Sequence, residues 1–352
     1  MDKKIKAAAL GEIMLRLSPP GADRFLQATS FDVNFGGAEA NVMLALASWG
    51  IPSAFVTRLP AHDVGQSAVN FLRRYGVDTS FISRGGDRVG IYYLENAASL
   101  RASRVIYDRA GSAFALSSRA DYDWDAVFGS MDAAAAYFHF SGITPALSER
   151  TAEMTLCALR EAKKRGIRVS CDVNYRAKLW TEEKAGETMS ALLPYCDLVI
   201  ANEEQVKNLF GISAGESEND AIDLSLTEKT ARLFMAEYGI KNVALTVRRT
   251  VNASENLFTA VAVSEKDASY ESARAPVYDI PITDRVGSGD AFAAGLIYSL
   301  INGRSMSDAV AFAAAACALK HSVPGDAAVI SADEVESMKN AMNKGAAGRI
   351  ER

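Results

Sequence analysis

Short apolar runs that alternate with amphipathic stretches are the feature that most constrains the fold of this 352-residue chain. Runs bounded by turn residues begin at positions 7, 54, 136, 167, 197 and 243. Apolar side chains recur at helical spacing in residues 38–49, 148–165, 182–193 and 226–238. Strands that alternate with helices predict βαβ units, and therefore a doubly wound, mostly parallel α/β sheet with helices on both faces.

Two regions, residues 12–35 and 88–108, depart from this alternation. They are rich in aromatic residues or alternate with period two, which suits a small antiparallel sheet better than the main parallel one. We expect these two excursions to form a β lid over the strand ends of a single domain that spans residues 1–343. Residues 344–352 are expected to form a flexible tail.

Charge and cysteine usage exclude several classes of protein. A net charge of −5 provides no general basic surface, so nucleic acid is not an expected partner. The four cysteines and three histidines are scattered, which predicts neither a zinc site nor a disulfide framework. Glu12 interrupts the first apolar run and no stretch has the length of a membrane span, so we expect a cytoplasmic protein without membrane association.

The stretch DRVGSGDAFAAG, residues 284–295, places three small residues immediately before an apolar helical segment. The first backbone N–H groups of a helix have no intrahelical partner, and the helix dipole adds positive potential there. Small residues allow a phosphate to approach these groups. Gly287, Ser288 and Gly289 are therefore predicted to form an anion hole.

Asp290 follows this anion hole directly. A carboxylate would repel a resting phosphate, but phosphoryl transfer needs a general base that accepts the proton of the attacking hydroxyl. The alternative is an acidic first-turn residue that merely complements the helix dipole. The chain has neither the GxGxxG spacing nor a Walker loop, so a nucleotide would bind through a different motif.

DRVGSGDAFAAGLI, together with FGGAEANVMLALASWG near the N-terminus, resembles the ribokinase-like (PfkB) family of carbohydrate kinases over nearly the whole chain. The resemblance implies that residues 287–289 receive the ATP phosphate and that Asp290 is catalytic. It also implies that Gly36 and Gly37 line a sugar site, and that ATP and Mg²⁺ are used.

Three further segments, GEIMLRLSPP, YDRAGSA and DVNYRAKLW, resemble the 2-keto-3-deoxygluconate kinases within that family. The resemblance implies phosphorylation of the primary hydroxyl of this sugar acid, which yields 2-keto-3-deoxy-6-phosphogluconate and ADP. Tyr93 could exchange roles with its neighbour Tyr92. The implied substrate-binding residues are Gly37, Tyr92, Tyr107, Arg109, Arg176, Asp290 and Asp326.

Two arginines at a sugar site favour a ligand that carries its own negative charge, because neutral sugars are usually held by carboxylates, amides and aromatic rings. A sugar acid meets this requirement. Alternatively, Arg109 pairs with Asp108 or Asp121, Arg176 is a surface charge, and the tyrosines only pack within the lid.

The nucleotide motifs of the family are altered in this chain. Its NxxE element is NEEQ, residues 202–205. The resemblance implies that the glutamate of this element acts near magnesium and phosphate, and Gln205 lacks its charge. Asn202 remains an ATP-site candidate, with Thr246 and Arg248 as weaker ones. No metal ligand is certain: Mg²⁺ would be bound mainly through ATP, with Glu203 or Glu204 reaching it through water.

Two other functions remain open at this stage. The chain could be a kinase of the same family for ketodeoxygalactonate, fructose or a ribonucleoside. It could also be a non-catalytic sugar-acid binding protein on the same fold. The edges of the lid strands further predict a homodimer formed through the lid.

Overall fold

The main sheet of the computed structural model contains ten strands, counted over the described residues 4–215, 222–252, 254–267 and 269–343. Its order is β13 (Ser269–Arg274), β12 (Glu255–Lys266), β11 (Asn242–Asn252), β10 (Leu198–Asn202), β9 (Arg168–Asp172), β8 (Tyr137–Ser141), β1 (Ala7–Leu10), β4 (Ser53–Leu59) and β5 (Ile82–Arg84), with β14 (Tyr278–Pro281) paired to β12. In this order, every neighbouring pair from β11 through to β5 is parallel. Strand β12 pairs antiparallel with β11, and β13 and β14 each pair antiparallel with β12. The predicted tail, 344–352, lies outside the described residues.

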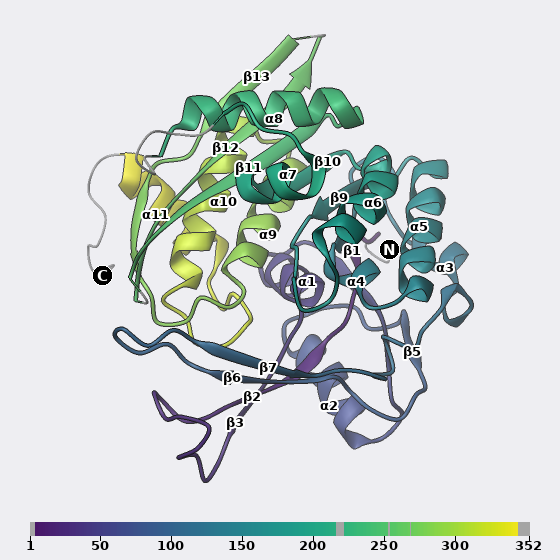
Figure 1. Cartoon of the computed structure of the whole chain (residues 1–352). Coiled ribbons are helices and arrows are strands. Elements are labelled where there is room, and N and C mark those ends of the chain that lie inside the picture. The colour runs from purple at the N-terminus through teal and green to yellow at the C-terminus, as the bar shows by residue number, and fades with distance from the viewer. Residues whose placement is uncertain (1–3, 216–221, 253, 268, 344–352) are drawn as a thin grey trace.

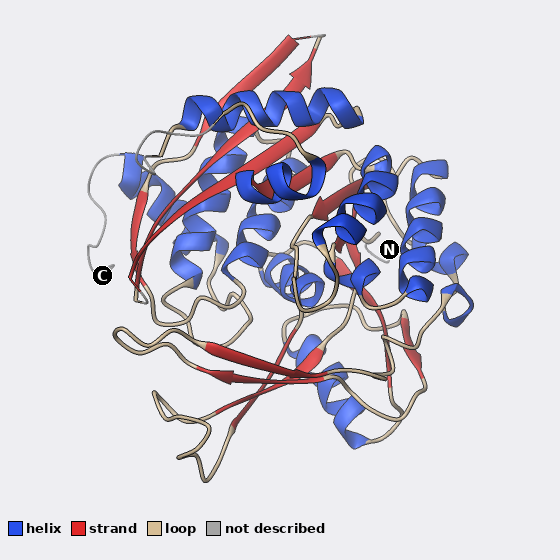
Figure 2. Cartoon of the chain, in the orientation of Figure 1, coloured by secondary structure: helices blue, strands red, loops and turns tan. Residues whose placement is uncertain are grey.

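Helices cover both faces of this sheet (Figure 2), which confirms the predicted fold class. Strand β1 shows the physical cause: Ala7 and Ala9 contribute to one core, whereas Ala8 and Leu10 contribute to the other. The first core is covered by α1 (Ala38–Ser48), α2 (Asp63–Arg74), α9 (Ser288–Ile301), α10 (Met306–Lys320) and α11 (Ala332–Asn343). The second is covered by α3 (Trp124–Gly129), α5 (Glu149–Lys164), α6 (Glu182–Leu192), α7 (Glu203–Phe210) and α8 (Leu224–Tyr238), and the short α4 (Ile143–Ala146) follows β8.

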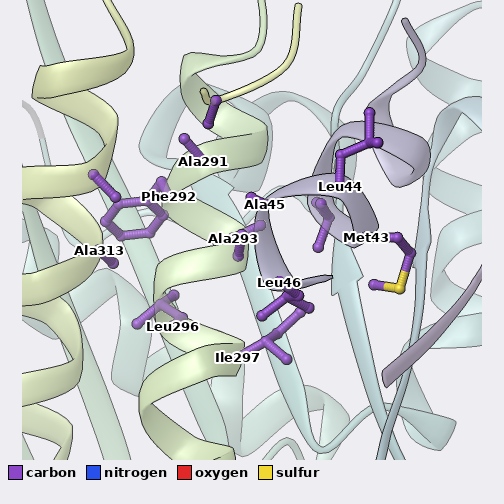
Figure 3. Packing of buried hydrophobic residues seen from close by; sticks show 14 of the residues in the cluster. Met43, Leu44, Ala45, Leu46, Ala291, Phe292, Ala293, Leu296, Ile297 and Ala313 are labelled. Atoms are coloured by element: carbon purple, nitrogen blue, oxygen red, sulfur yellow. The ribbon is translucent and has the colours of Figure 1, made fainter. Parts of the chain in front are cut away.

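Helix α9 packs between α1 and α10, and this packing holds its N-terminus in place (Figure 3). Gly295 allows the close approach of α10, because a Cβ atom there would lie 2.6 Å from the Cα of Ala313. Most alanines of α10 are buried against their neighbours, and Ala311 and Ala318 are half-buried. Leu296 is also fully buried, so Leu296→Ala is expected to cost about 2–5 kcal/mol of stability.

A second sheet of four strands lies across one end of the main body (Figure 1). Its order is β3 (Asp32–Gly36), β2 (Met14–Ser18), β6 (Ile91–Glu95) and β7 (Arg104–Asp108). It joins the two excursions predicted from the sequence, each as an antiparallel hairpin. The central pair, β2 and β6, is parallel, because the outgoing strand of each hairpin lies at the centre. We call this sheet the lid sheet.

Candidate active site

A cavity of about 980 Å³ lies between the lid sheet and the carboxyl ends of the parallel strands. This is where ligands bind in open α/β sheets. Its lining unites residues that the sequence places far apart. The predicted site residues that line it are Gly36, Gly37, Tyr92, Tyr107, Arg109, Arg176, Asn202, Glu203, Glu204, Thr246, Arg248, Gly287, Ser288, Gly289, Asp290 and Asp326.

Residues 287–289, which we call the GSG turn, start helix α9. Gly287 has a φ of +81°, and a Cβ atom there would lie 2.1 Å from the carbonyl oxygen of Asp326, so only glycine fits without strain. A Cβ on Gly289 would meet no atom within 4 Å. No side chain caps the helix, so none competes with an anion in the cavity for its first N–H groups. The N–H of Ser288 donates a bond of 3.4 Å to the backbone carbonyl of Arg285, which is long for a hydrogen bond.

Asp290 lies in the first turn of α9 and lines the same cavity. The side-chain amide of Asn41 donates a hydrogen bond of 2.7 Å to its Oδ2. Burial raises the pKa of Asp290 to about 7, while Asn41 lowers it and nearby Asp172 raises it. A carboxyl group with this pKa can both accept and release a proton near neutral pH.

Asp172 ends β9 and was not singled out from the sequence. Its position as the last residue of an apolar strand is the signal that could have found it. Its Oδ1 accepts a hydrogen bond of 3.1 Å from the backbone of Asn174. Burial raises the pKa of Asp172 to about 6, and Arg176 lowers it. A second carboxyl group therefore lines the same cavity, close enough to raise the pKa of Asp290.

The tyrosines of β6 point in opposite directions because successive strand residues face opposite sides of a sheet. Tyr92 is buried, lines the cavity and donates a hydrogen bond to Asp326. Tyr93 does not line it; its ring lies 6.5 Å from that of Phe25 and 6.0 Å from that of Phe31. The structure therefore brings Tyr92, and not Tyr93, to the cavity. Tyr107 lies beside Tyr92 with a centroid distance of 6.1 Å.

Arg109 lines the cavity and forms a buried ion pair with Glu12. The predicted alternative, a pair with Asp108 or Asp121, is wrong. Those two carboxylates pair with arginines from neighbouring segments, Arg88 at 2.9 Å and Arg58 at 3.5 Å. Arg109 lies in the turn after β7, next to the segment before β2, so Glu12 is the nearer carboxylate. This pair holds the guanidinium of Arg109 at the lid end of the cavity.

Arg176 lies in the loop after β9 and has an exposed side chain that also lines the cavity. Its Nη1 donates a hydrogen bond of 3.2 Å to the backbone of Tyr175. Its positive charge lowers the pKa values of Asp172 and Asp290. Arg176 is thus both a surface charge and a cavity residue.

Asp326 is almost completely buried, with 2% of its surface exposed. Its Oδ2 accepts a bond of 2.8 Å from Arg16, and its Oδ1 accepts the hydroxyl of Tyr92. A Cβ atom on Gly36 would lie 2.0 Å from this Oδ1, so the glycine makes room for the carboxylate. Sequence reasoning missed Arg16, although it lies within GEIMLRLSPP.

At the other end of the cavity, Asn202 caps helix α7 and accepts the N–H of Gln205 at 2.8 Å. In turn, the side-chain oxygen of Gln205 accepts a bond of 3.0 Å from the backbone N–H of Asn202. Glutamine therefore preserves this capping box without a charge. Thr246 donates a bond of 3.3 Å to the carbonyl of Ala201, and the side chain of Arg248 is exposed.

Glu203 and Glu204 begin α7; the first is half-buried and the second exposed. Within residues 4–215, 222–252, 254–267 and 269–343, no three acidic, histidine or cysteine side chains converge as metal ligands would. In that same part of the chain, no helix combines the length and the apolar character needed to cross a membrane.

Comparison with known proteins identifies relatives over nearly the full length of the chain. A curated 2-dehydro-3-deoxygalactonokinase from Haloferax volcanii is 34% identical over 326 residues, which cover 93% of this chain and 94% of the relative. A 2-dehydro-3-deoxygluconokinase from Bacillus subtilis is 27% identical and covers 92% and 91%. The prefix 2-dehydro is equivalent to 2-keto.

A crystal structure of 2-dehydro-3-deoxygluconokinase from Thermotoga maritima is 42% identical, with a TM-score of 0.89 and coverage of 96% of this chain and 99% of that one. A putative ribokinase II from E. coli in complex with ATP and Mg²⁺ shares the fold at 18% identity, with a TM-score of 0.75 and coverage of 95% and 98%. The model of the pfkB family carbohydrate kinases matches residues 4–333. With the GSG turn, Asp290 and the lid sheet around one cavity, this match shows that the chain belongs to the pfkB family of carbohydrate kinases.

Proposed function

We propose that this kinase transfers the γ-phosphoryl group of ATP to the primary hydroxyl of 2-keto-3-deoxygluconate. One observation carries the proposal: Asp290 and the GSG turn share a single cavity with two arginines, Arg109 and Arg176. Asp290 and the GSG turn suit phosphoryl transfer, and the two guanidinium groups suit an acceptor that bears a carboxylate. The 42% identity to the Thermotoga enzyme supports the same substrate class.

Asp290 acts as the general base. Its carboxylate accepts the proton of the primary hydroxyl as the oxygen attacks the γ-phosphorus and the bond to the β-phosphate oxygen breaks. The hydrogen bond from Asn41 holds Oδ2 in place, which leaves Oδ1 for the substrate. The backbone amides of the GSG turn receive the charge on the transferred group without having to reorganise.

Arg109 and Arg176 bind the carboxylate of the sugar acid, with Tyr92 and Tyr107 beside the carbon chain. A hydrogen bond to a charged group contributes about 1.5–3 kcal/mol. Each arginine contact therefore favours an acid over a neutral sugar by about tenfold or more. Gly36, Gly37 and Asp326 complete the sugar end, where Asp326 is held by Arg16 and Tyr92.

Asn202, Thr246 and Arg248 are proposed to bind ATP at the far end of the cavity. Mg²⁺ would arrive on the triphosphate, with Glu203 or Glu204 as an outer contact through water. When bound, Mg²⁺ neutralises charge on the phosphate oxygens. Dependence on ATP is also the reason to place the enzyme in the cytoplasm.

The test is a coupled assay of ADP release with the purified full-length chain and a panel of acceptors. We expect 2-keto-3-deoxygluconate to give the highest kcat/KM, and fructose and a ribonucleoside to give values lower by at least tenfold. Absence of ADP release with every acceptor, together with measurable binding of the sugar acid, would instead support a non-catalytic binding protein.

A second candidate substrate is 2-keto-3-deoxygalactonate, because the Haloferax relative bears the name of that activity at 34% identity. The two sugar acids are C-4 epimers, and the carboxylate and primary hydroxyl used above are common to both. Equal or higher kcat/KM for the galactonate in the same panel would favour this candidate.

We also propose that the lid sheet forms a homodimer. Several large apolar side chains on it and its loops are exposed, including Val33 at 66% and Leu26 at 93%. A second copy would cover these side chains and the free strand edges. Light scattering at micromolar concentration should give twice the chain mass of 37.7 kDa. Val33→Glu should lower the measured mass towards that of a single chain.

A further inference from the structure

Arg16 connects the lid sheet to two aspartates, Asp284 and Asp326, that lie next to the GSG turn. It lies on lid strand β2, yet only 4% of it is exposed. Its Nη1 lies 2.8 Å from Asp326 and its Nη2 lies 2.8 Å from Asp284. Its Nε donates a bond of 2.9 Å to Ser18 on the same strand, so the guanidinium has a fixed orientation. One lid side chain therefore joins two carboxylates from the main body.

Both aspartates contact the backbone at or next to the GSG turn. Asp284 accepts the backbone N–H of Val286 at 3.0 Å, just before the turn, and the backbone N–H of Gly325 at 3.0 Å. The carbonyl of Asp326 lies against Gly287, where a Cβ atom would be 2.1 Å away. A displacement of either aspartate would therefore break a contact at or next to the turn.

A second buried cation balances the charges behind the turn. Lys320, at the end of α10, is 0% exposed and its Nζ donates a bond of 2.9 Å to the carbonyl of Val323. Asp284 and Asp326 are the principal negative charges that act on it. Lys320 is thus a second buried basic group near the two carboxylates, and its hydrogen bond goes to a backbone carbonyl. Loss of Arg16 would leave an unpaired carboxylate in the interior, which proteins tolerate poorly.

We propose that Arg16 is a positioning residue that couples the lid sheet to the GSG turn. Arg16 touches neither the base nor the anion hole. It fixes the lid strand relative to Asp284 and Asp326, and through them it fixes the turn. A buried arginine is suited to this role because its planar group binds two carboxylates at once, whereas a lysine ammonium acts as a single point charge.

The functional consequence rests on the proposed function. A sugar acid under the lid sheet would tighten the binding of a triphosphate at the turn, and by linkage the reverse would hold by the same factor. We expect the sugar acid to lower the Kd of MgAMP-PNP about tenfold in the wild-type protein. In Arg16→Gln this factor should fall to about two or less.

The first experiment needs no ligand, so it tests the coupling even if the proposed function fails. Hydrogen exchange is measured on wild type, Arg16→Gln and Arg16→Lys. We expect the amides of Val286 and Gly325 to exchange about tenfold faster in Arg16→Gln, together with those of β2. Arg16→Lys should give an intermediate result, and it decides the question if Arg16→Gln does not fold. Faster exchange in β2 alone would overturn the proposal.

The matched control is Arg24→Gln. Arg24 is also an arginine of the lid region with a carboxylate partner, Glu95 at 3.8 Å. Its side chain is 53% exposed, and this partner belongs to the lid sheet and not to the segments around the turn. The control should leave exchange at Val286 and Gly325 unchanged. Calorimetric titration of MgAMP-PNP with and without 2-keto-3-deoxygluconate then measures the coupling. A folded Arg16 variant that keeps the wild-type factor would overturn it, whereas a wild type that binds neither ligand would refute the proposed function alone.

Discussion

The two ends of the cavity are built in different ways. The GSG turn and Asp290 stand on α9, whose residues Ala291 and Phe292 are buried in the main core. The lid end stands on a sheet whose own described core has only three buried members, Met14, Tyr92 and Leu94. A small sheet with so little core depends on the main body for stability. The proposed chemistry therefore lies on a rigid frame, and the proposed substrate selection lies on a less strongly anchored one.

The largest effect should follow from removal of the base on the rigid frame. Asp290→Asn keeps the shape of the side chain but cannot accept the proton, so kcat should fall by about a thousandfold. The KM of the sugar acid should change little. Steady-state kinetics of ADP release measures both constants, and turnover near that of wild type would exclude Asp290 as the base.

A substitution in the GSG turn should test how rigid this end is. Gly287→Ala places a Cβ against the carbonyl of Asp326 at a φ of +81°, which should cost about 3 kcal/mol of stability. Urea unfolding measures this loss. The matched control, Gly289→Ala, meets no atom within 4 Å and should change stability by less than about 1 kcal/mol. Equal losses in both variants would contradict the role of the left-handed conformation.

At the lid end, Arg109→Gln should act on substrate selection. Loss of one charged contact should raise the KM of the sugar acid about 10- to 100-fold and change kcat less. Arg88→Gln is the control, because Arg88 pairs with Asp108 on the surface and does not line the cavity. An equal loss of kcat/KM with a neutral sugar would show that Arg109 does not recognise the carboxylate.

The smallest effect concerns pH. The base must be ionised, and its pKa is raised to about 7, so kcat/KM should fall tenfold per pH unit as the pH drops below about 7. The bond from Asn41 favours the ionised form, and its removal raises the pKa. Asn41→Ala should therefore move the acid limb of the pH profile to higher pH. A limb that stays in place would mean that Asn41 does not control this proton.

The lid sheet shows how far sequence reasoning reached. Period-two alternation in residues 12–35 and 88–108 predicted both hairpins, and the GSG turn with Asp290 was predicted because its chemistry lies within a few consecutive residues. The partner of Arg109 was not, since Glu12 lies 97 positions away. Asn41 was missed for the same reason, because it lies 249 positions from the carboxylate it orients.

The sequence by itself determined the layered α/β fold, the lid hairpins and the small-residue start of α9, because each arises from the spacing of neighbouring residues. Only the tertiary structure decided which carboxylate pairs with which cation. Arg16 finds Asp284 and Asp326 across 268 and 310 positions, a choice made by the packing of the lid sheet against the main body. The attraction between two charges depends on their distance in space, which residue spacing along a chain does not specify.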